Sequence, residues 1–339
     1  MMAAGYSVDL TVVWLLILAF SVFAYIVMDG FDLGVGMLFP FAKTDADRDV
    51  MMSSVAPVWD GNETWLVLGG GGLFAAFPLA YSVLMPALYA PIMAMLLGLT
   101  FRGVAFEYRW RTVRGRAAWD RAFAGGSFVA AFAQGVALGA ILQGIQVSGR
   151  QYAGGWWDWL TPFTMLTGGS VVVGYGLLGA TWLNMKTEES LQAWALAWSK
   201  GMGVAMIVCI VAVSAATPFL KAAYYVRWLE WPRVLMTAQV PLLVALAAYL
   251  FFRTVRQRRE VAPFLIALAL FALSFAGLCI SMFPYLVPNS ITIWDAAAPR
   301  SSQMFMLVGA AVLIPVILAY TGHAYWVFRG KAKSGAAYH

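Results

Sequence analysis

Long apolar segments alternate with short polar stretches along the whole chain. Nine of these segments are long enough to cross a bilayer, which takes about 20 helical residues. The intervening polar stretches reach only about 15–20 residues, too short for a further domain. The pattern predicts an all-α integral membrane protein with a single polytopic domain over residues 1–339. The predicted spans cover residues 8–28, 62–80, 82–101, 122–147, 162–184, 201–220, 233–252, 261–283 and 302–327.

The basic residues are distributed unevenly between the predicted loops. Of the 22 Lys and Arg residues, 17 fall in the odd-numbered loops and the C-terminal tail, and 5 in the even-numbered loops. Because Lys and Arg accumulate on the cytoplasmic side of membrane proteins, this split predicts an N-terminus outside and a cytoplasmic C-terminus.

Composition strengthens the membrane interpretation. Apolar residues make up 62% of the chain and charged residues 11%, whereas a soluble domain has about 25% charged residues. Disorder, a disulfide scaffold and a nucleic-acid-binding domain are thereby excluded. The net charge of +6 fits contact with anionic lipid and the topology above.

Acidic residues inside the apolar segments are the strongest chemical signal. Asp29, Asp32, Asp60 and Glu63 lie within or at the edge of the first two spans. A charged acid at the bilayer centre costs about 2.5–3.5 kcal/mol, so such residues face protein, water or a proton path. Asp29 and Asp32 are three residues apart, and so are Asp60 and Glu63, so the two acids of each pair share a helix face. The alternative is that these acids sit at helix ends, solvated or capping.

Other polar and small residues predict helix packing. The glycines of DGFDLGVG (29–36) and those at 69–72 allow helices to approach closely. Gln134, Gln143 and Gln146 fit amides that bridge helices, with a hydrated path as the alternative.

Two sets of residues predict contact with the membrane interface. Arg102, Glu107, Arg109 and Arg111 follow the third span and predict an interfacial helix at the lipid headgroups. His323, near Tyr325 and Trp326, fits an aromatic belt better than a haem ligand.

Several longer stretches together resemble a known family. They are MDGFDLGVGMLFPF (28–41), APVWDGNETWLVLGGGGLFAAFP (56–78), FRGVAFEYR (101–109), MFPYLVPNSITIWDA (282–296) and SSQMFMLVGAAVLIPVILAY (301–320). In this order they resemble the second subunit of cytochrome bd-type quinol:oxygen oxidases. The short segment 221–232 is similar to the compact, cyanide-insensitive type.

The resemblance implies a fold, cofactors and partners. It implies nine transmembrane helices, arranged as two four-helix bundles plus one helix, in the bacterial cytoplasmic (inner) membrane. The complex would couple quinol oxidation to reduction of dioxygen to water and contribute to the proton motive force. Haem b and haem d, or b-type haem alone, would be carried by subunit I. A structural quinone or lipid in an apolar cleft is also implied, and a small single-helix subunit is left open.

The resemblance also assigns roles to residues. It implies that Asp60 lies at the subunit interface, on a proton path from the cytoplasm to the oxygen-reducing haem. Trp59 and Asn62 would be its neighbours, and Asp29 and Asp32 are secondary candidates. Glu63 stands where some members carry Gln, which weakens a general role for it.

Two other functions remain open from the residues alone. A stand-alone secondary transporter would use Asp29 and Asp60 as coupling acids and would contain inverted repeats. A purely structural partner would use the acids only to bridge helices, and Asp60→Asn would then leave turnover intact.

Overall fold

The structure, a computed structural model, describes residues 9–112 and 114–332 and is almost entirely helical. Its longer helices are α1 (Leu10–Leu38), α3 (Trp59–Ala76), α5 (Tyr89–Arg109), α6 (Arg116–Gln143), α7 (Pro162–Lys186), α8 (Glu189–Leu220), α11 (Gln239–Arg256), α12 (Ala262–Met282) and α14 (Arg300–Val327). The shorter ones are η1 (Phe39–Phe41), α2 (Asp45–Val55), α4 (Pro78–Ala87), α9 (Ala222–Leu229), α10 (Val234–Thr237) and α13 (Ile293–Ala296).

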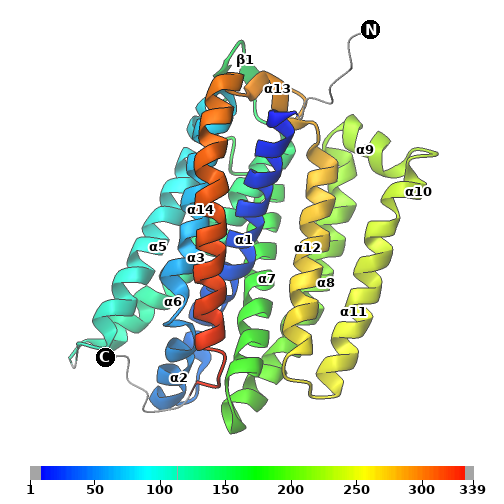
Figure 1. Cartoon of the computed structure of the whole chain (residues 1–339). Coiled ribbons are helices and arrows are strands. Elements are labelled where there is room, and N and C mark those ends of the chain that lie inside the picture. The colour runs from blue at the N-terminus through cyan, green and yellow to red at the C-terminus, as the bar shows by residue number, and fades with distance from the viewer. Residues whose placement is uncertain (1–8, 113, 333–339) are drawn as a thin grey trace.

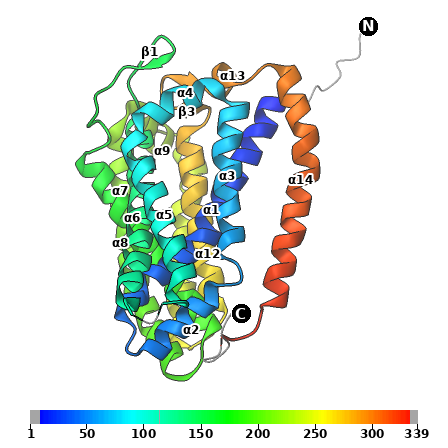
Figure 2. The same cartoon turned by 90° about the vertical axis from the view of Figure 1, so that its left-hand side faces the viewer.

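The long helices run roughly side by side, and the short elements gather at the two ends (Figure 1). Helix α1 packs on α3, α6 and α7, while α5 packs on α6. Helices α8, α11 and α12 extend the layer beyond α7. Helix α14 lies along the outside and contacts α1 and α3 (Figure 2).

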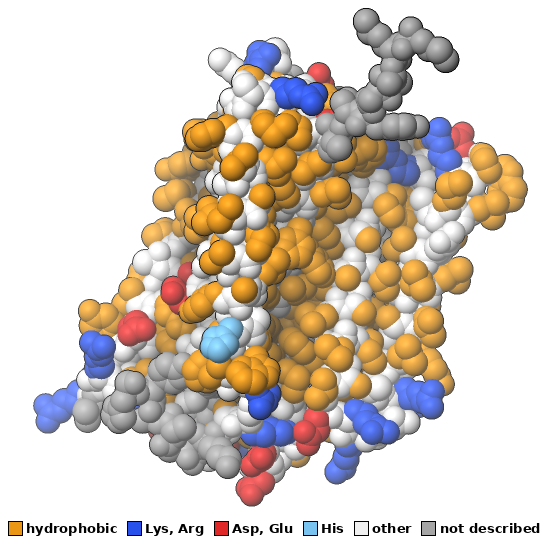
Figure 3. Space-filling view, viewed as in Figure 1, with side chains coloured by type: hydrophobic (Ala, Val, Ile, Leu, Met, Phe, Trp, Pro, Cys, Tyr) orange, Lys and Arg blue, Asp and Glu red, His pale blue; other side chains and the backbone are white. Residues whose placement is uncertain are grey.

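Eight helical segments in the described part of the chain are long and apolar enough to cross a membrane. Helix α3, on the predicted span 62–80, does not reach this hydropathy because of its polar first turn and its glycines. The multi-pass helical architecture is therefore confirmed, whereas the count of nine spans and the orientation of the termini stay predictions. Hydrophobic side chains cover the middle of the molecule, and Lys and Arg lie mostly toward its ends (Figure 3).

Helix boundaries differ from the predicted spans at two informative places. Helix α1 continues to Leu38, ten residues past the predicted end at residue 28, because the glycine-rich stretch is helical and buried. The predicted span 82–101 is divided between α4, which ends at Ala87, and α5, which runs to Arg109. Apolar periodicity alone does not register a break between two adjacent apolar helices.

Small residues bring α1 against α7. A Cβ atom on Gly34 would overlap the carbonyl oxygen of Tyr175, and one on Gly179 would overlap the backbone of Gly34. The predicted close approach at residues 29–36 is thereby confirmed. Gly70 and Gly71 behave differently, because a Cβ atom there would meet nothing within 4 Å in the described residues.

Two small antiparallel ribbons close one end of the molecule. They pair β1 (Val147–Ser148) with β2 (Gln151–Tyr152), and β3 (Tyr285–Val287) with β4 (Ile291–Thr292). At the opposite end, Lys186 Nζ donates to the carbonyl oxygens of Phe328 (2.5 Å) and Gly330 (3.0 Å). This contact fastens the segment after α14 to the end of α7.

Candidate functional site

Arg102 forms the centre of a buried ionic cluster. Its side chain is 0% exposed, and its Nη1 donates to Asp29 Oδ1 (3.0 Å) and to Glu63 Oε1 (2.9 Å). Asp32 Oδ2 lies 3.9 Å from Nη2. The cluster therefore joins α5 to α1 and α3.

The position of Arg102 corrects the prediction of an interfacial helix after the third span. Helix α5 extends to Arg109, so Arg102 lies within the membrane helix and not at the headgroups. Arg109 is also buried, with a 0% exposed side chain. Each guanidinium is compensated by carboxylates from other helices, which removes the cost of an unpaired buried charge.

Asn62 connects the cluster to α14. Its Nδ2 donates to Asp32 Oδ2 (2.7 Å), and its Oδ1 accepts from the Tyr325 hydroxyl (3.0 Å). A small cavity of about 20 Å³ adjoins this amide, which is room for about one water molecule. The cavity is lined by Pro57, Val58, Gly61, Asn62, Tyr320, Thr321, Ala324 and Tyr325. Asn62 thus forms a polar link between the buried acids and the space between α3 and α14.

A second ionic cluster surrounds Arg109. Its Nε donates to Asp120 (2.5 Å) and its Nη1 to Asp49 (2.7 Å), and Arg116 also binds Asp49. This cluster holds α2 against α5 and α6 at the end of the molecule where the chain turns from α1 into α2.

Four aromatic rings separate the two arginine clusters. Trp59 lies under Arg102 (5.9 Å) and stacks on Phe106, with ring centroids 5.1 Å apart. Phe106 contacts Phe123, and Phe123 contacts Phe39, on which Arg109 rests at 5.1 Å. Trp59 is therefore a packing neighbour of the cluster and part of an apolar barrier.

Asp60 lies apart from the buried acids. It is exposed in the first turn of α3, one turn before Glu63. Glu63 has a 27% exposed side chain and binds Arg102. The structure therefore brings together three of the four predicted acids and leaves Asp60 on the surface beside them.

The predicted amide bridges are present at two of three positions. Gln134 Nε2 donates to the Tyr25 hydroxyl (2.8 Å), and its Oε1 accepts from the Tyr175 hydroxyl (2.6 Å), so it joins α6 to α1 and α7. Gln143 accepts from Thr161 (2.8 Å). Gln146 lies beyond α6 in a loop, which corrects its placement in a span.

His323 lies where the aromatic belt was predicted. It lies exposed on α14 with its ring 6.1 Å from that of Trp326, as an interfacial belt requires. The described residues also contain no group of three or more His, Cys, Asp or Glu suited to a metal ion.

Sequence reasoning missed Arg102 and Tyr325 as members of the site. Arg102 is followed by further charged residues up to Arg111, and this run made the segment look like an interfacial helix. One signal was available, since intramembrane acids often pair with a residue of opposite charge, and Arg102 is the basic residue nearest to the third predicted span.

Comparison with known proteins places these features in a family. The model of the family "Cytochrome bd terminal oxidase subunit II" matches residues 10–328. The chain is 31% identical to cytochrome bd-I ubiquinol oxidase subunit 2 of Escherichia coli (strain K12), over 94% of each chain. It is 26% identical to cytochrome bd ubiquinol oxidase subunit 2 of Bacillus subtilis (strain 168), over 94% of this chain and 96% of that protein.

The fold agrees with a solved structure as well. The bd oxidase from Geobacillus thermodenitrificans contains a chain that superposes with a TM-score of 0.76 at 17% identity, covering 95% of this chain and 99% of that chain. The protein is thus a multi-pass helical subunit of a membrane oxidoreductase. It belongs to the cytochrome bd terminal oxidase subunit II family.

Membership in this family has direct consequences. The protein works in the bacterial inner membrane as part of a terminal oxidase complex that contains haem and a subunit I. The family resemblance expected from the sequence motifs is confirmed.

Proposed function

We propose that this chain stabilises a haem-bearing subunit I and supplies the path by which protons from the cytoplasm reach the oxygen-reducing haem of that subunit. In this proposal subunit I carries the haems, which are haem b and haem d, or b-type haem alone. Haem bound by subunit I would supply the reduction of dioxygen, while this chain binds its partner and delivers protons. Because quinol releases its protons outside, the uptake contributes to the proton motive force.

The observation that carries the proposal is the excess of acids over cations around Arg102. Three carboxyl groups, from Asp29, Asp32 and Glu63, face one guanidinium within hydrogen-bond or ion-pair distance. One cation balances one carboxylate, and low-dielectric surroundings disfavour further net charge. A cluster of this kind can hold and pass protons.

The cluster also has polar atoms available for further hydrogen bonds. Asp32 Oδ1, Arg102 Nε and Arg102 Nη2 are buried and have no hydrogen-bond partner among the described residues. Buried polar groups of this type are ordinarily satisfied by ordered water. Water at these atoms would connect the carboxyl groups into a proton-conducting chain.

The route to the surface runs along α3. The four aromatic rings between Arg102 and Arg109 contain no titratable group, so they oppose proton transfer through the bundle interior. Glu63 instead reaches the outer face of α3, where Asp60 is exposed, and Asn62 borders the small cavity between α3 and α14. In this proposal Asp60 is the proton-accepting group at the subunit interface, and Glu63 with Arg102 sets its electrostatic surroundings.

The same face of α3 fits a partner subunit. Val67 is 73% and Phe74 61% exposed, and Gly70 and Gly71 lie exposed on the same helix. Small residues between apolar ones let a helix of another chain approach closely in a membrane. We therefore assign this face to the contact with subunit I.

Purification through a tag on this chain in mild detergent tests the proposal. A larger subunit with a reduced-minus-oxidised haem spectrum should co-purify. A colourless, monodisperse chain that binds no partner, after a control for dissociation in detergent, would favour the stand-alone transporter instead. The purely structural alternative predicts instead that Asp60→Asn leaves the turnover of the complex intact.

A further inference from the structure

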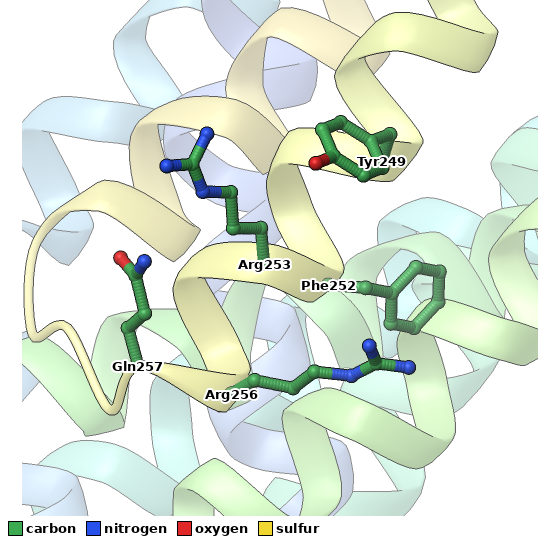
Figure 4. Close-up of a pocket in the computed structure, with 5 residues that line it drawn as sticks. All are labelled: Tyr249, Phe252, Arg253, Arg256 and Gln257. Carbon is green, nitrogen blue, oxygen red and sulfur yellow. The ribbon is translucent and has the colours of Figure 1, made fainter.

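A hollow at one end of α11 combines basic, aromatic and apolar side chains. It has a volume of about 470 Å³ and is lined by Tyr249, Phe252, Arg253, Arg256 and Gln257. All five come from the last turns of α11 and the residue after it (Figure 4). We refer to it as the α11 hollow.

The spacing along α11 places each arginine one turn beyond an aromatic ring. Tyr249 precedes Arg253, and Phe252 precedes Arg256, by four residues in each case. Residues four apart lie on the same side of a helix, and Figure 4 shows Phe252 and Arg256 directed to one side of α11. An aromatic ring below a cation is the arrangement found where a membrane helix enters the headgroup layer.

The two arginines are free to bind an external anion. Among the described residues, neither has a carboxylate within 4 Å. The nearest acid in sequence, Glu260, is paired with Lys331 at 2.8 Å. Arg258 and Arg259 follow in the chain but do not line the hollow. Unpaired basic residues at the end of a membrane helix attract anionic lipid.

An apolar stripe leads from the hollow toward the middle of the membrane. Leu242 (69% exposed), Leu246 (53%) and Tyr249 (63%) follow one another at helical spacing below Arg253. The opposite side of α11 packs on α8 and α12. The stripe offers a surface for an acyl chain, directly continuous with the basic end.

We propose that the α11 hollow binds the headgroup of an anionic phospholipid, with the phosphate held by Arg253 and Arg256 and an acyl chain along Leu246 and Leu242. Arginine suits this task because its planar fork binds phosphate oxygens in pairs. The site differs from the apolar cleft implied for a structural quinone or lipid, since it is defined by charge at the end of the helix. It is independent of the proton path on α3.

Native mass spectrometry of the purified complex tests the site, with phosphatidylglycerol and phosphatidylcholine as probes. The R253Q/R256Q double variant should bind phosphatidylglycerol about tenfold more weakly than the parent, with phosphatidylcholine binding unchanged. R258Q/R259Q is the matched control, because it removes the same charge at the same end outside the hollow, and it should bind phosphatidylglycerol within about twofold of the parent. The R253K/R256K variant keeps the positive charges but lacks the planar guanidinium groups, so its loss of affinity for phosphatidylglycerol should be intermediate.

Three results would overturn the proposal. One is equal affinity of the parent and the R253Q/R256Q variant for phosphatidylglycerol. A second is an equal loss in the R258Q/R259Q control, which would indicate general electrostatic attraction. The third is complete displacement of phosphatidylglycerol by excess inorganic phosphate, which would identify a site for free phosphate. The haem spectrum of each preparation verifies that the complex is assembled.

Discussion

Arg102 on α5 donates to Glu63 on α3 across 2.9 Å, although 39 residues separate them in the chain. This contact joins a fully buried guanidinium to an acid that reaches the surface. It therefore links the buried acids Asp29 and Asp32 to the side of α3 where Asp60 lies.

Loss of the central cation should destabilise the complex. Arg102→Gln leaves three carboxyl groups without their compensating charge, and removing one partner of a buried ion pair costs about 3–5 kcal/mol. We expect a lower thermal midpoint and a lower yield of haem-containing complex. Arg111→Gln, at an exposed position two residues after α5, is the control and should behave as the parent. Equal thermal midpoints for Arg102→Gln and the parent would contradict the assigned role of the cluster.

The glycines on α3 should matter for the partner and not for the fold of this chain. Gly71→Leu adds a side chain where nothing lies within 4 Å in the described residues. Forcing it into a packed subunit interface costs about 1–3 kcal/mol, so the amount of co-purified subunit I should fall about tenfold. Gly201→Leu, exposed on α8 with nothing within 4 Å, is the matched control. If both variants retain subunit I fully, α3 is not the docking face.

Gly34 should be sensitive even to a single added methyl group. Gly34→Ala places a Cβ atom against the backbone of Tyr175, so α1 and α7 must separate, at a cost of about 1–3 kcal/mol. Gly201→Ala meets nothing and replaces glycine by a better helix former. Thermal unfolding of the purified complex should therefore show opposite shifts for the two variants. A Gly34→Ala protein as stable as the parent would show that the two helices do not approach as described.

The ion pair between Glu260 and Lys331 should make the attachment of the segment after α14 dependent on pH. The hydrogen bond from Lys331, with a smaller one from Gln192, lowers the pKa of Glu260 from its ordinary value of 4.5. Because the pKa of Glu260 is lower in the folded protein than in the unfolded chain, the ion pair stabilises the folded state above pH 4.5. This stabilisation is lost as the pH falls through the lowered pKa. Limited proteolysis beyond α14 should thus accelerate in acid.

Glu260→Gln provides the test of that pH dependence. At neutral pH this variant should already be cleaved faster than the parent, and its cleavage should change less on acidification. Glu107→Gln, at an exposed position on α5, is the control. Identical cleavage profiles for Glu260→Gln and the parent would show that the pair does not hold this segment.

The sequence predicted the helical class because apolar runs of bilayer length are unmistakable. It also identified Asp29, Asp32 and Glu63 as unusual, since an acid in an apolar run requires an explanation. It misplaced Arg102 because the break at Leu88 moves α5 along the chain, and an apolar window does not detect such a break. Contacts such as that of Asn62 with Tyr325, 263 residues apart, depend on the packing of α14 and have no local signal.

Oxygen consumption by the Asp60→Asn complex tests the central proposal most directly. Asparagine keeps the shape of the side chain and removes its ability to accept a proton. We expect full haem content with a quinol oxidase rate lowered about a hundredfold, and partial recovery in Asp60→Glu. Glu230→Gln, an exposed acid in the loop after α9, should retain the parent rate. Full haem and full oxygen consumption in Asp60→Asn would contradict a proton path through this chain.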